Sequence, residues 1–525
     1  MRPLYVVLVG VLLLLAVVGA ALVVFATSKA SLVPDSRALA RVEMPLGGGT
    51  VESVTAVTGP HSRRVPVEMQ GNLVFPQNKL WAGRTFTIDV VVKRPGWISW
   101  LSGDRQHLEL TVTTPAANLS HSYVTLARQA PLRVTFSRPV TAISYGASRS
   151  HVTKHTLASP SRVVTLHRTA LAGSIWVSGL ALGWETARPH LLSWFPAGAA
   201  TAAVASPAPG RVIRPHTPIT LTFSKPVSTA LGRSHPAVLP ATPGTWRQLN
   251  SHAIIFRPEG YGYGLGAHVK IALPSDIRLV GGQAGSASSS GNWTVPPGST
   301  RRLQQLLATL GYLPLNFHGP TVPSTTAAQE AAAVKPPSGT FSWRYGNEPS
   351  ALRNMWSPGT FGTMTQGAVM AFENDHGLTT DGTAGPAVWK ALISAALSGK
   401  KSSFGYTFVM VSEATPESLT LWHNGKNEFS VPVNTGIPSA PTATGTYPVF
   451  EHLPVTTMSG TNPDGSHYSD PGIPWVSYFN GGDALHGFTR AQYGFPQSLG
   501  CVEMTATDAG RVYPFTPIGT LVNVA

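Results

Sequence analysis

A cysteine, a histidine and a glycine near the C-terminal end have the types and spacing that acyl transfer requires. Cys501 is the single cysteine among 525 residues, Gly500 precedes it, and His486 lies 15 positions earlier. A cysteine nucleophile needs a base for its proton, donors for the oxyanion and access to substrate. The imidazole of His486 could exchange a proton with the thiol near neutral pH, and Gly500 would let backbone amides approach a substrate carbonyl. By themselves these residues are weak evidence, and a buried, inert cysteine is the alternative.

Strands are expected to position these residues. Alternating and β-branched segments occur at 406–412, 418–422 and 429–433, and the last two are joined through Asn424-Gly425, a strong hairpin turn. We therefore expect a mostly-β domain over residues 404–525. His486-Gly487 and the phrase SLGCVEM would then lie at neighbouring strand ends.

Five ordered phrases of this region resemble the L,D-transpeptidase catalytic domain family. They are FVMVS with LTLWHNG, PVNTG with PTATGTYPV, WVSYFNGGDALHG, SLGCVEM and IGTLVNV. The resemblance implies that Cys501 is the acylated nucleophile and His486 the general base. It also implies that Gly500 is part of the oxyanion hole and that Ser498 supports the loop.

Two positions depart from the family pattern. Leu499 stands where many members have His, and Glu503 stands where many have Arg. The first change places the proton transfer on His486 alone. The second removes a cation that could lower the thiol pKa or hold a substrate carboxylate. The substrate-binding positions expected from the resemblance are Tyr478, Gly487 and Glu503.

The reaction implied by the resemblance is peptidoglycan cross-linking. Cys501 would attack the carbonyl of the third residue of a donor tetrapeptide stem, expel the terminal D-Ala and form a thioester, which an amine of a neighbouring stem would resolve into a 3-3 cross-link. The implied chemistry uses no metal and no cofactor. A non-catalytic wall-binding or adhesion protein is one alternative. An L,D-carboxypeptidase or thiol peptidase acting on stem peptides is the other.

A helical region precedes this domain. Leucines at 303, 306, 307 and 310 follow helical spacing, and TQGAVMAF and AVWKALISAAL give two further amphipathic segments. Their order resembles the three-helix peptidoglycan-binding domain over residues 301–398, with a long insertion after the first helix. Asp381 and Trp389 would line or support a glycan or peptide surface, although Trp389 fits a core position at least as well.

Residues 37–296 are expected to form extracellular β modules. The segment APLRVTFSRPV at 130–140 returns as TPITLTFSKPV at 217–227, an offset of 87 residues, which is the length of an immunoglobulin-like sandwich. The resemblance is to bacterial Ig-like spacer domains, with one or two modules at 37–205 and one at 206–296. They contain no cluster of Cys, His and carboxylates with metal-ligand or catalytic spacing.

The N-terminus and the charge suggest where the protein works. Residues 4–26 carry no charge and are long enough to cross the roughly 30 Å hydrocarbon layer, so residues 1–28 are expected to be a signal anchor, with the rest on the extracytoplasmic side at the cell wall. The net charge is +14, yet residues 401–525 have four basic and nine acidic side chains. The basic front is expected to attract anionic cell-wall polymers or lipid headgroups, and no nucleic-acid-binding signature is present. The fold class predicted is multidomain: a transmembrane helix, Ig-like β-sandwiches, a small α-helical domain and a mostly-β catalytic domain.

Overall fold

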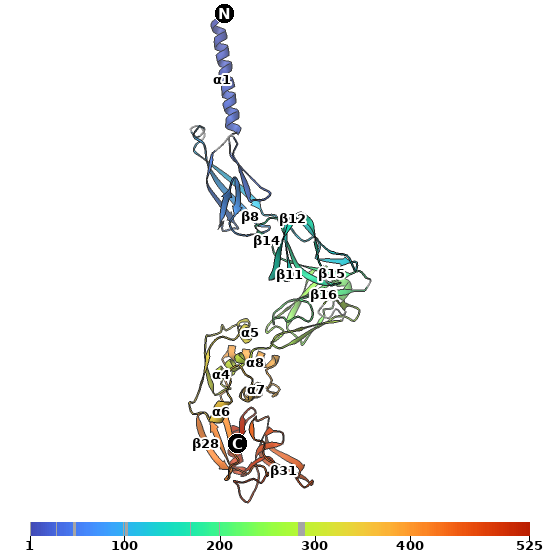
Figure 1. Cartoon of the computed structure of the whole chain (residues 1–525), viewed down its shortest axis with the longest axis vertical. Helices are drawn as coiled ribbons and strands as arrows, with labels where there is room; N and C mark the ends of the chain where they lie inside the picture. The colour runs from blue at the N-terminus through green and yellow to red at the C-terminus, as the bar shows by residue number, and fades with distance from the viewer. Residues whose placement is uncertain are drawn as a thin grey trace.

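The chain forms an elongated series of units in this computed structural model. It describes residues 2–27, 29–45, 49–97, 99, 103–168, 170–198, 200–281 and 289–525. Helix α1 (Arg2–Thr27) stands at one end and the C-terminal strands at the other (Figure 1). Within α1, side chains are described for 8–20 and 23 alone. Over the described residues, no helix combines the length and apolar character that a membrane span needs. The anchor expected at 1–28 falls partly outside that description and stays a prediction.

Two four-stranded sheets enclose the core of the first β unit. Phe86, Ile88, Val90 and Val92 are buried on alternate positions of β8, which is the period of a strand with one face in a core. They pack with Val74 of the opposite sheet. The first sheet has the order β1 (Ser31–Val33), β2 (Ala40–Glu43), β6 (Leu73–Pro76), β5 (Val67–Gln70), and the second β4 (Arg63–Val65), β3 (Thr50–Thr58), β8 (Thr85–Lys93), β9 (Arg105–Thr113).

The second β unit is built on one five-stranded sheet. Leu132, Val134 and Phe136 are buried on alternate positions, as their sequence pattern predicts. The long strands β11 and β12 contain register shifts, which bend a strand. The order is β10 (Tyr123–Leu126), β15 (His190–Pro196), β13 (Gly173–Leu180), β11 (Leu132–Ser148), β12 (His151–Leu166). A two-stranded sheet of β7 (Leu80–Trp81) and β14 (Glu185–Thr186) joins this unit to the first.

The third β unit has a five-stranded and a three-stranded sheet around one core. Ile219, Leu221 and Phe223 of the central strand β17 pack with Val269 and Trp293 of the other sheet. The larger sheet has the order β19 (Gly244–Asn250), β20 (Ala253–Pro258), β17 (Ile219–Phe223), β16 (Ala202–Ser206), β22 (Arg278–Leu279), and the smaller β18 (Ala237–Leu239), β21 (His268–Ala272), β23 (Ser290–Thr294); α3 (Val227–Leu231) follows β17.

Three helices lie where the leucine, TQGAVMAF and AVWKALISAAL segments predict them: α4 (Thr300–Thr309), α7 (Thr363–Asp375) and α8 (Pro386–Ser398). Trp389 is buried in their core, as its apolar environment predicts. The insertion after α4 is folded and contains α5 (Thr326–Val334), α6 (Ser350–Asn354) and an antiparallel pair, β24 (Leu315–His318) and β25 (Thr340–Trp343), which flanks α5 in sequence.

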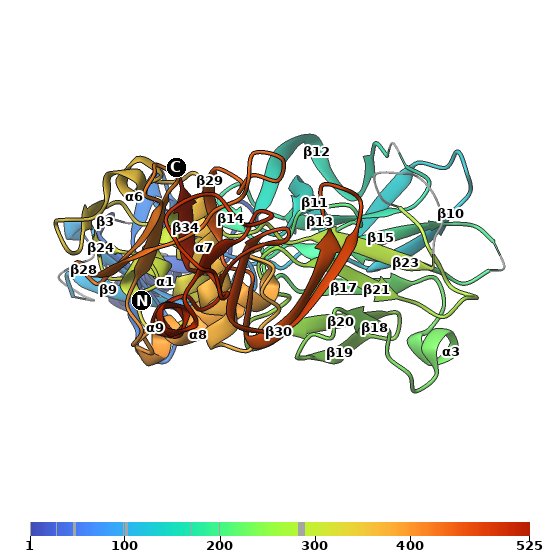
Figure 2. The same ribbon diagram turned by 90° about the horizontal axis from the view of Figure 1, so that it is seen from below.

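The C-terminal unit is mostly β, as predicted. Its first sheet packs on the helical region through Phe408, Trp422 and Leu521, and its inner face meets the second sheet through Val502 and Met504. The hairpin of β30 and β31 extends away from α8 and α9 (Figure 2). The first sheet has the order β28 (Lys426–Pro432), β27 (Ser418–His423), β26 (Thr407–Ser412), β34 (Leu521–Val524), β29 (Gly445–Pro448), and the second β30 (Glu451–Thr461), β31 (His467–Asn480), β32 (Asp483–Gly487), β33 (Val502–Met504); α9 (Ala506–Val512) and the short helix η2 (Tyr513–Phe515) follow.

Candidate active site

Two parallel strands bring the predicted nucleophile and base to one place. His486 lies on β32 and pairs with Glu503 on β33, while Cys501 immediately precedes β33. Leu485 and Val502, which pair in the same ladder, are 1% and 0% exposed and hold the two strands in the core. The 15-residue separation in sequence is therefore closed by a strand-loop-strand connection, as the sequence predicts.

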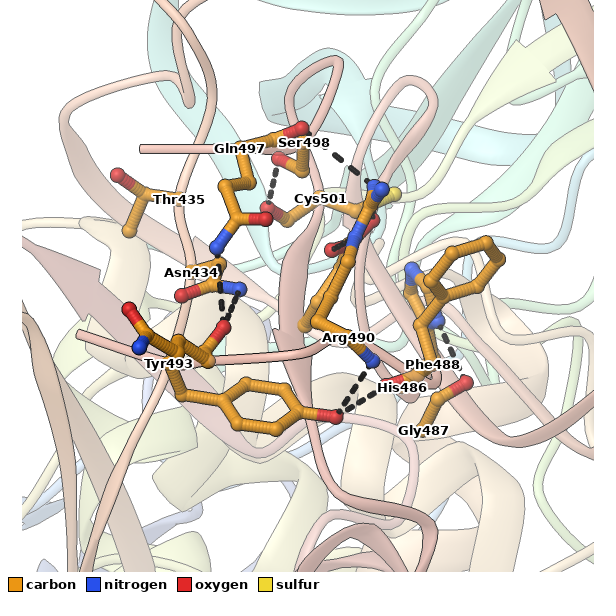
Figure 3. A network of polar contacts seen from close by, with 12 residues as sticks. Asn434, Thr435, His486, Gly487, Phe488, Arg490, Tyr493, Gln497, Ser498 and Cys501 are labelled. Atoms are coloured by element: carbon orange, nitrogen blue, oxygen red, sulfur yellow. Dashed lines mark hydrogen bonds and ion pairs between the residues drawn. The ribbon is translucent and has the colours of Figure 1, made fainter. Parts of the chain in front are cut away.

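Ser498 fixes the loop that carries Cys501. Its backbone N–H donates to Thr435 O and its carbonyl accepts from Ile437 N, each at 2.9 Å. The hydroxyl donates to Cys501 O (Figure 3). It also accepts from Gly500 N at 3.2 Å. Ser498 is thus a loop support in the geometry, while the Gly500 amide, expected at the oxyanion hole, is engaged by a side chain.

Gly500 adopts a backbone conformation that favours glycine. Its φ is +113°, and a Cβ at this position would lie 2.5 Å from Oδ1 of Asp483. Asp483 is itself held in place, because its Oδ2 accepts from Ala443 N at 3.1 Å. Asp483 lies within the phrase WVSYFNGGDALHG but was not singled out there, since its position beside the loop depends on the β31–β32 turn.

The thiol of Cys501 is neutral in this environment. Its Sγ–H donates to Gly482 O at 3.5 Å, and the residue is partly accessible. Burial of the sulfur, with smaller effects from the carboxylates of Asp483 and Glu503, raises the pKa of Cys501 to about 12. The Ala484 amide opposes this shift. A thiolate is therefore not the resting form of Cys501.

His486 is neutral as well, and its tautomer is defined. The ring is 2% exposed, and burial lowers the pKa of His486. Nδ1 lies 3.1 Å from Gly487 O, which can accept but not donate, so Nδ1 carries the proton. Nε2 is left with a free lone pair, and in Figure 3 this nitrogen points toward the side of the site where the Cys501 sulfur lies. The thiol and the imidazole are thus both neutral.

Arg490 supplies a cation that the sequence reading missed. Its Nε and Nη2 donate to the two carboxylate oxygens of Glu503 at 2.7 and 2.9 Å, and Nη2 also approaches Gln497 O at 3.4 Å. The guanidinium lies over the ring of Phe488 at 4.5 Å, and that ring stands edge-on to His486 with centroids 6.1 Å apart. The ion pair raises the pKa of Arg490. The absence of Arg at 503 was the signal that could have prompted a search for another cation nearby.

The three expected substrate-binding residues occupy different settings. Tyr478 lies on β31 opposite Ala484, and burial, with a smaller effect of the nearby Cys501, raises the pKa of its phenol. Gly487 is packed against α9, since a Cβ there would lie 2.9 Å from Ala506 Cα. The carboxylate of Glu503 is 6% exposed and both of its oxygens are occupied by Arg490. Gly487 and Glu503 are thus committed to packing and to an ion pair, while Tyr478 packs against the same hydrophobic cluster as Cys501.

No metal site is evident in the part of the chain that the structure describes. There, no three His, Cys, Asp or Glu side chains gather closely enough to hold an ion. The side chains at the site are suited to proton exchange and acyl transfer on sulfur.

Comparison with known families and structures identifies two regions. Residues 406–524 match the L,D-transpeptidase catalytic domain, and residues 344–392 match a putative peptidoglycan binding domain. No curated protein has a significantly similar sequence.

Similar solved structures include an L,D-transpeptidase from Mycobacterium smegmatis, with 12% identity, 62% of this chain and 100% of that chain covered, and a TM-score of 0.21. The catalytic domain of the Enterococcus faecium L,D-transpeptidase is 22% identical over 24% of this chain and 100% of its own, with a TM-score of 0.21. An L,D-transpeptidase from Mycobacterium tuberculosis is 14% identical over 61% and 96% of the two chains, with a TM-score of 0.20.

Proposed function

Because residues 406–524 are an L,D-transpeptidase catalytic domain preceded by a peptidoglycan-binding domain, we propose that this chain forms 3-3 cross-links in peptidoglycan through a Cys501 thioester. The observation that carries the proposal is the placement of Cys501 on a loop braced by Ser498, next to the strand that bears a buried, Nδ1-protonated His486.

In the first half-reaction the Cys501 sulfur attacks the carbonyl carbon of the third stem residue. The thiol proton passes to Nε2 of His486 as the C–S bond forms, since thiol and imidazole both begin neutral. The Cys501 amide has no hydrogen-bond acceptor among the described residues and is available to the oxyanion. Collapse breaks the amide bond, and the imidazolium returns its proton to the departing D-Ala nitrogen.

In the second half-reaction an amine of a neighbouring stem attacks the thioester. His486 takes a proton from the attacking nitrogen, a new amide bond forms, and the sulfur leaves with that proton. Water in place of the amine would give a carboxylic acid, which is the L,D-carboxypeptidase alternative. The ratio of cross-linking to hydrolysis depends on whether the amine or water reaches the thioester first.

The remaining units support a role at the wall. We propose that residues 1–28 anchor the chain and that the β modules at 37–205 and 206–296 act as a stalk. In Figure 1 they lie between α1 and the catalytic unit, with the helical region at 301–398 beside the latter. Such an arrangement would hold the catalytic domain at 404–525 away from a membrane and close to its polymer substrate, on the extracytoplasmic side.

The test is incubation of the purified chain with disaccharide tetrapeptide, followed by mass spectrometry. We expect loss of D-Ala, a transient adduct on Cys501 and cross-linked dimers. Cys501→Ala should abolish all three. Equal product from the wild type and Cys501→Ala would exclude the enzyme, and D-Ala release without dimers would assign the carboxypeptidase reaction instead.

A further inference from the structure

We propose that the junction of the first two β units binds an anionic saccharide, a sugar ring that carries a phosphate or carboxylate. The site is a cavity of about 300 Å³ whose lining includes Trp81, Arg84, Arg188 and His190. The assignment of the sugar to a wall polymer rests on the proposed function. The chemistry by which the cavity would recognise an anionic sugar does not depend on that function.

The cavity is preformed because two segments far apart in sequence are locked together beside it. Strands β7 and β14 pair in parallel, with Leu80 opposite Glu185 and Trp81 opposite Thr186. The Trp184 indole N–H also donates to Arg37 O at 2.9 Å, which ties the second unit to the first. Ligand sites commonly form at such junctions, where binding needs little reorganisation.

The lining combines an apolar base with positive charge. Phe136 and Val177, which are 2% and 0% exposed, contribute apolar surface, whereas Arg84 and Arg188 are exposed. None of the lining residues is acidic. Across the described residues neither guanidinium forms an ion pair with a carboxylate, so both retain donors for an oxyanion.

Trp81 orients one of these arginines. The Arg188 guanidinium carbon lies 5.9 Å from the centroid of the Trp81 ring, within the range of a cation–π contact. The indole is 44% exposed, an unusual setting for the largest apolar side chain. The acidic residue of β14, Glu185, does not line the cavity, because its carboxylate accepts from Leu182 N at 2.9 Å.

The position of the cavity favours a polymer over a lipid headgroup. In Figure 1, β14 lies at the end of the first unit opposite α1. If α1 marks the membrane side, the body of the first unit separates the cavity from the bilayer surface. A wall polysaccharide, in contrast, would reach this junction along the length of the chain.

The experiment measures binding of the full chain to four probes: phosphomannan, polygalacturonate, uncharged dextran and phosphatidylglycerol vesicles. We expect one or both of the charged polymers to bind, and affinity to fall with salt. Arg84→Ala/Arg188→Ala should weaken that binding at least tenfold, and Trp81→Ala should weaken it severalfold. The matched control is Arg63→Ala/Arg64→Ala, which removes the same charge from exposed positions of β4 outside the cavity.

Three results would contradict the proposed binding site. Equal weakening by the two double variants would mean general attraction to a basic chain. Equal binding of dextran would remove the role of the anion, and binding of vesicles alone would assign a lipid surface. Acyl transfer on a soluble tetrapeptide should be the same in Arg84→Ala/Arg188→Ala as in the wild type. A chain that binds polymer without transferring acyl groups would therefore contradict the proposed enzyme and leave the site intact.

Discussion

Arg490 forms a bidentate ion pair with Glu503 beside the nucleophile loop, with nitrogen–oxygen distances of 2.7 and 2.9 Å. Glu503 is also the residue that pairs with His486 across β32 and β33. The guanidinium in turn covers Phe488, whose ring lies edge-on to the imidazole. The ion pair therefore contacts the surroundings of the base on two sides, through the strand pairing of Glu503 and through the ring of Phe488.

Arg490→Ala should reduce both local stability and acylation. It leaves the Glu503 carboxylate, whose side chain is 6% exposed, without its partner, while Arg490 itself is 30% exposed. We expect a cost of about 2–4 kcal/mol, near the lower end of the range for breaking a buried pair. Hydrogen exchange of the β32 and β33 amides measures the loss of local stability. The rate of β-lactam acylation of Cys501 measures the loss of activity.

The matched control exchanges the two charges. Arg490→Glu/Glu503→Arg keeps an ion pair at the same place, so it should recover part of the exchange protection and acylation lost in either single variant. A double variant no better than the worse single variant would show that the pair does not act as a unit.

Sequence patterns predicted the elements of the site better than its contacts. The strands around His486 and Cys501 and the bracing role of Ser498 followed from phrases that are contiguous in the chain. Arg490 could not be found this way, because it lies in a loop that folds back through a hydrogen bond from its own N–H to the Tyr493 hydroxyl at 3.2 Å. Such a loop has no periodicity.

In the β modules too, the sequence pattern predicts the strands but not how fully each strand is covered by its neighbours. The alternation in 132–136 correctly predicts which side chains of β11 face the core. The matching alternation in 219–223 is typical of a half-buried strand, yet Thr220 and Thr222 are 5% and 3% exposed. Strand β17 is central in its sheet and is covered on both faces. The repeated sequence does not predict this tertiary environment.

His486→Gln should slow acylation by about 10²- to 10⁴-fold, the usual contribution of a general base. Glutamine can still donate to Gly487 O, so the strand should keep its conformation. In the wild type, acylation should decline as pH falls through the pKa of His486, which burial holds below 6.5, because the protonated ring cannot accept the thiol proton. Unchanged β-lactam labelling in the variant would show that His486 is not the general base.

The raised pKa of Cys501, about 12, predicts a slow reaction with simple alkylating agents. Only the thiolate reacts, so the rate with iodoacetamide should be well below that of an ordinary thiol at pH 7 and should still be rising at pH 10. As Cys501 is the single cysteine, the label reports on one site. The same chain in denaturant should titrate near the ordinary value of 9.0. A plateau near pH 7 in the folded protein would show a preformed thiolate.

His452 predicts an acid-sensitive step in stability. It stacks on Tyr513 with ring centroids 3.7 Å apart, and burial lowers its pKa from 6.5 to about 4. Between these pH values the unfolded chain binds a proton that the folded chain does not, so stability is complete above 6.5 and falls as pH drops toward 4. His452→Phe keeps an aromatic ring there and removes the titration. Its unfolding temperature should therefore fall less than that of the wild type over this window, and parallel curves would exclude His452 as the source.

Gly500→Ala should abolish most acylation while leaving the rest of the fold intact. At φ of +113° an L side chain is strained, and its Cβ would lie 2.5 Å from the Asp483 carboxylate, so the loop or Asp483 must move. Movement of the loop displaces the Cys501 sulfur relative to His486, and a shift of about 1 Å can cost about 10²-fold in rate. Gly465→Ala is the control, because Gly465 also has a positive φ, +87°, at the tip of the β30–β31 hairpin but meets nothing within 4 Å. The control should retain acylation, and a Gly500→Ala enzyme of wild-type rate would mean that the loop tolerates the displacement.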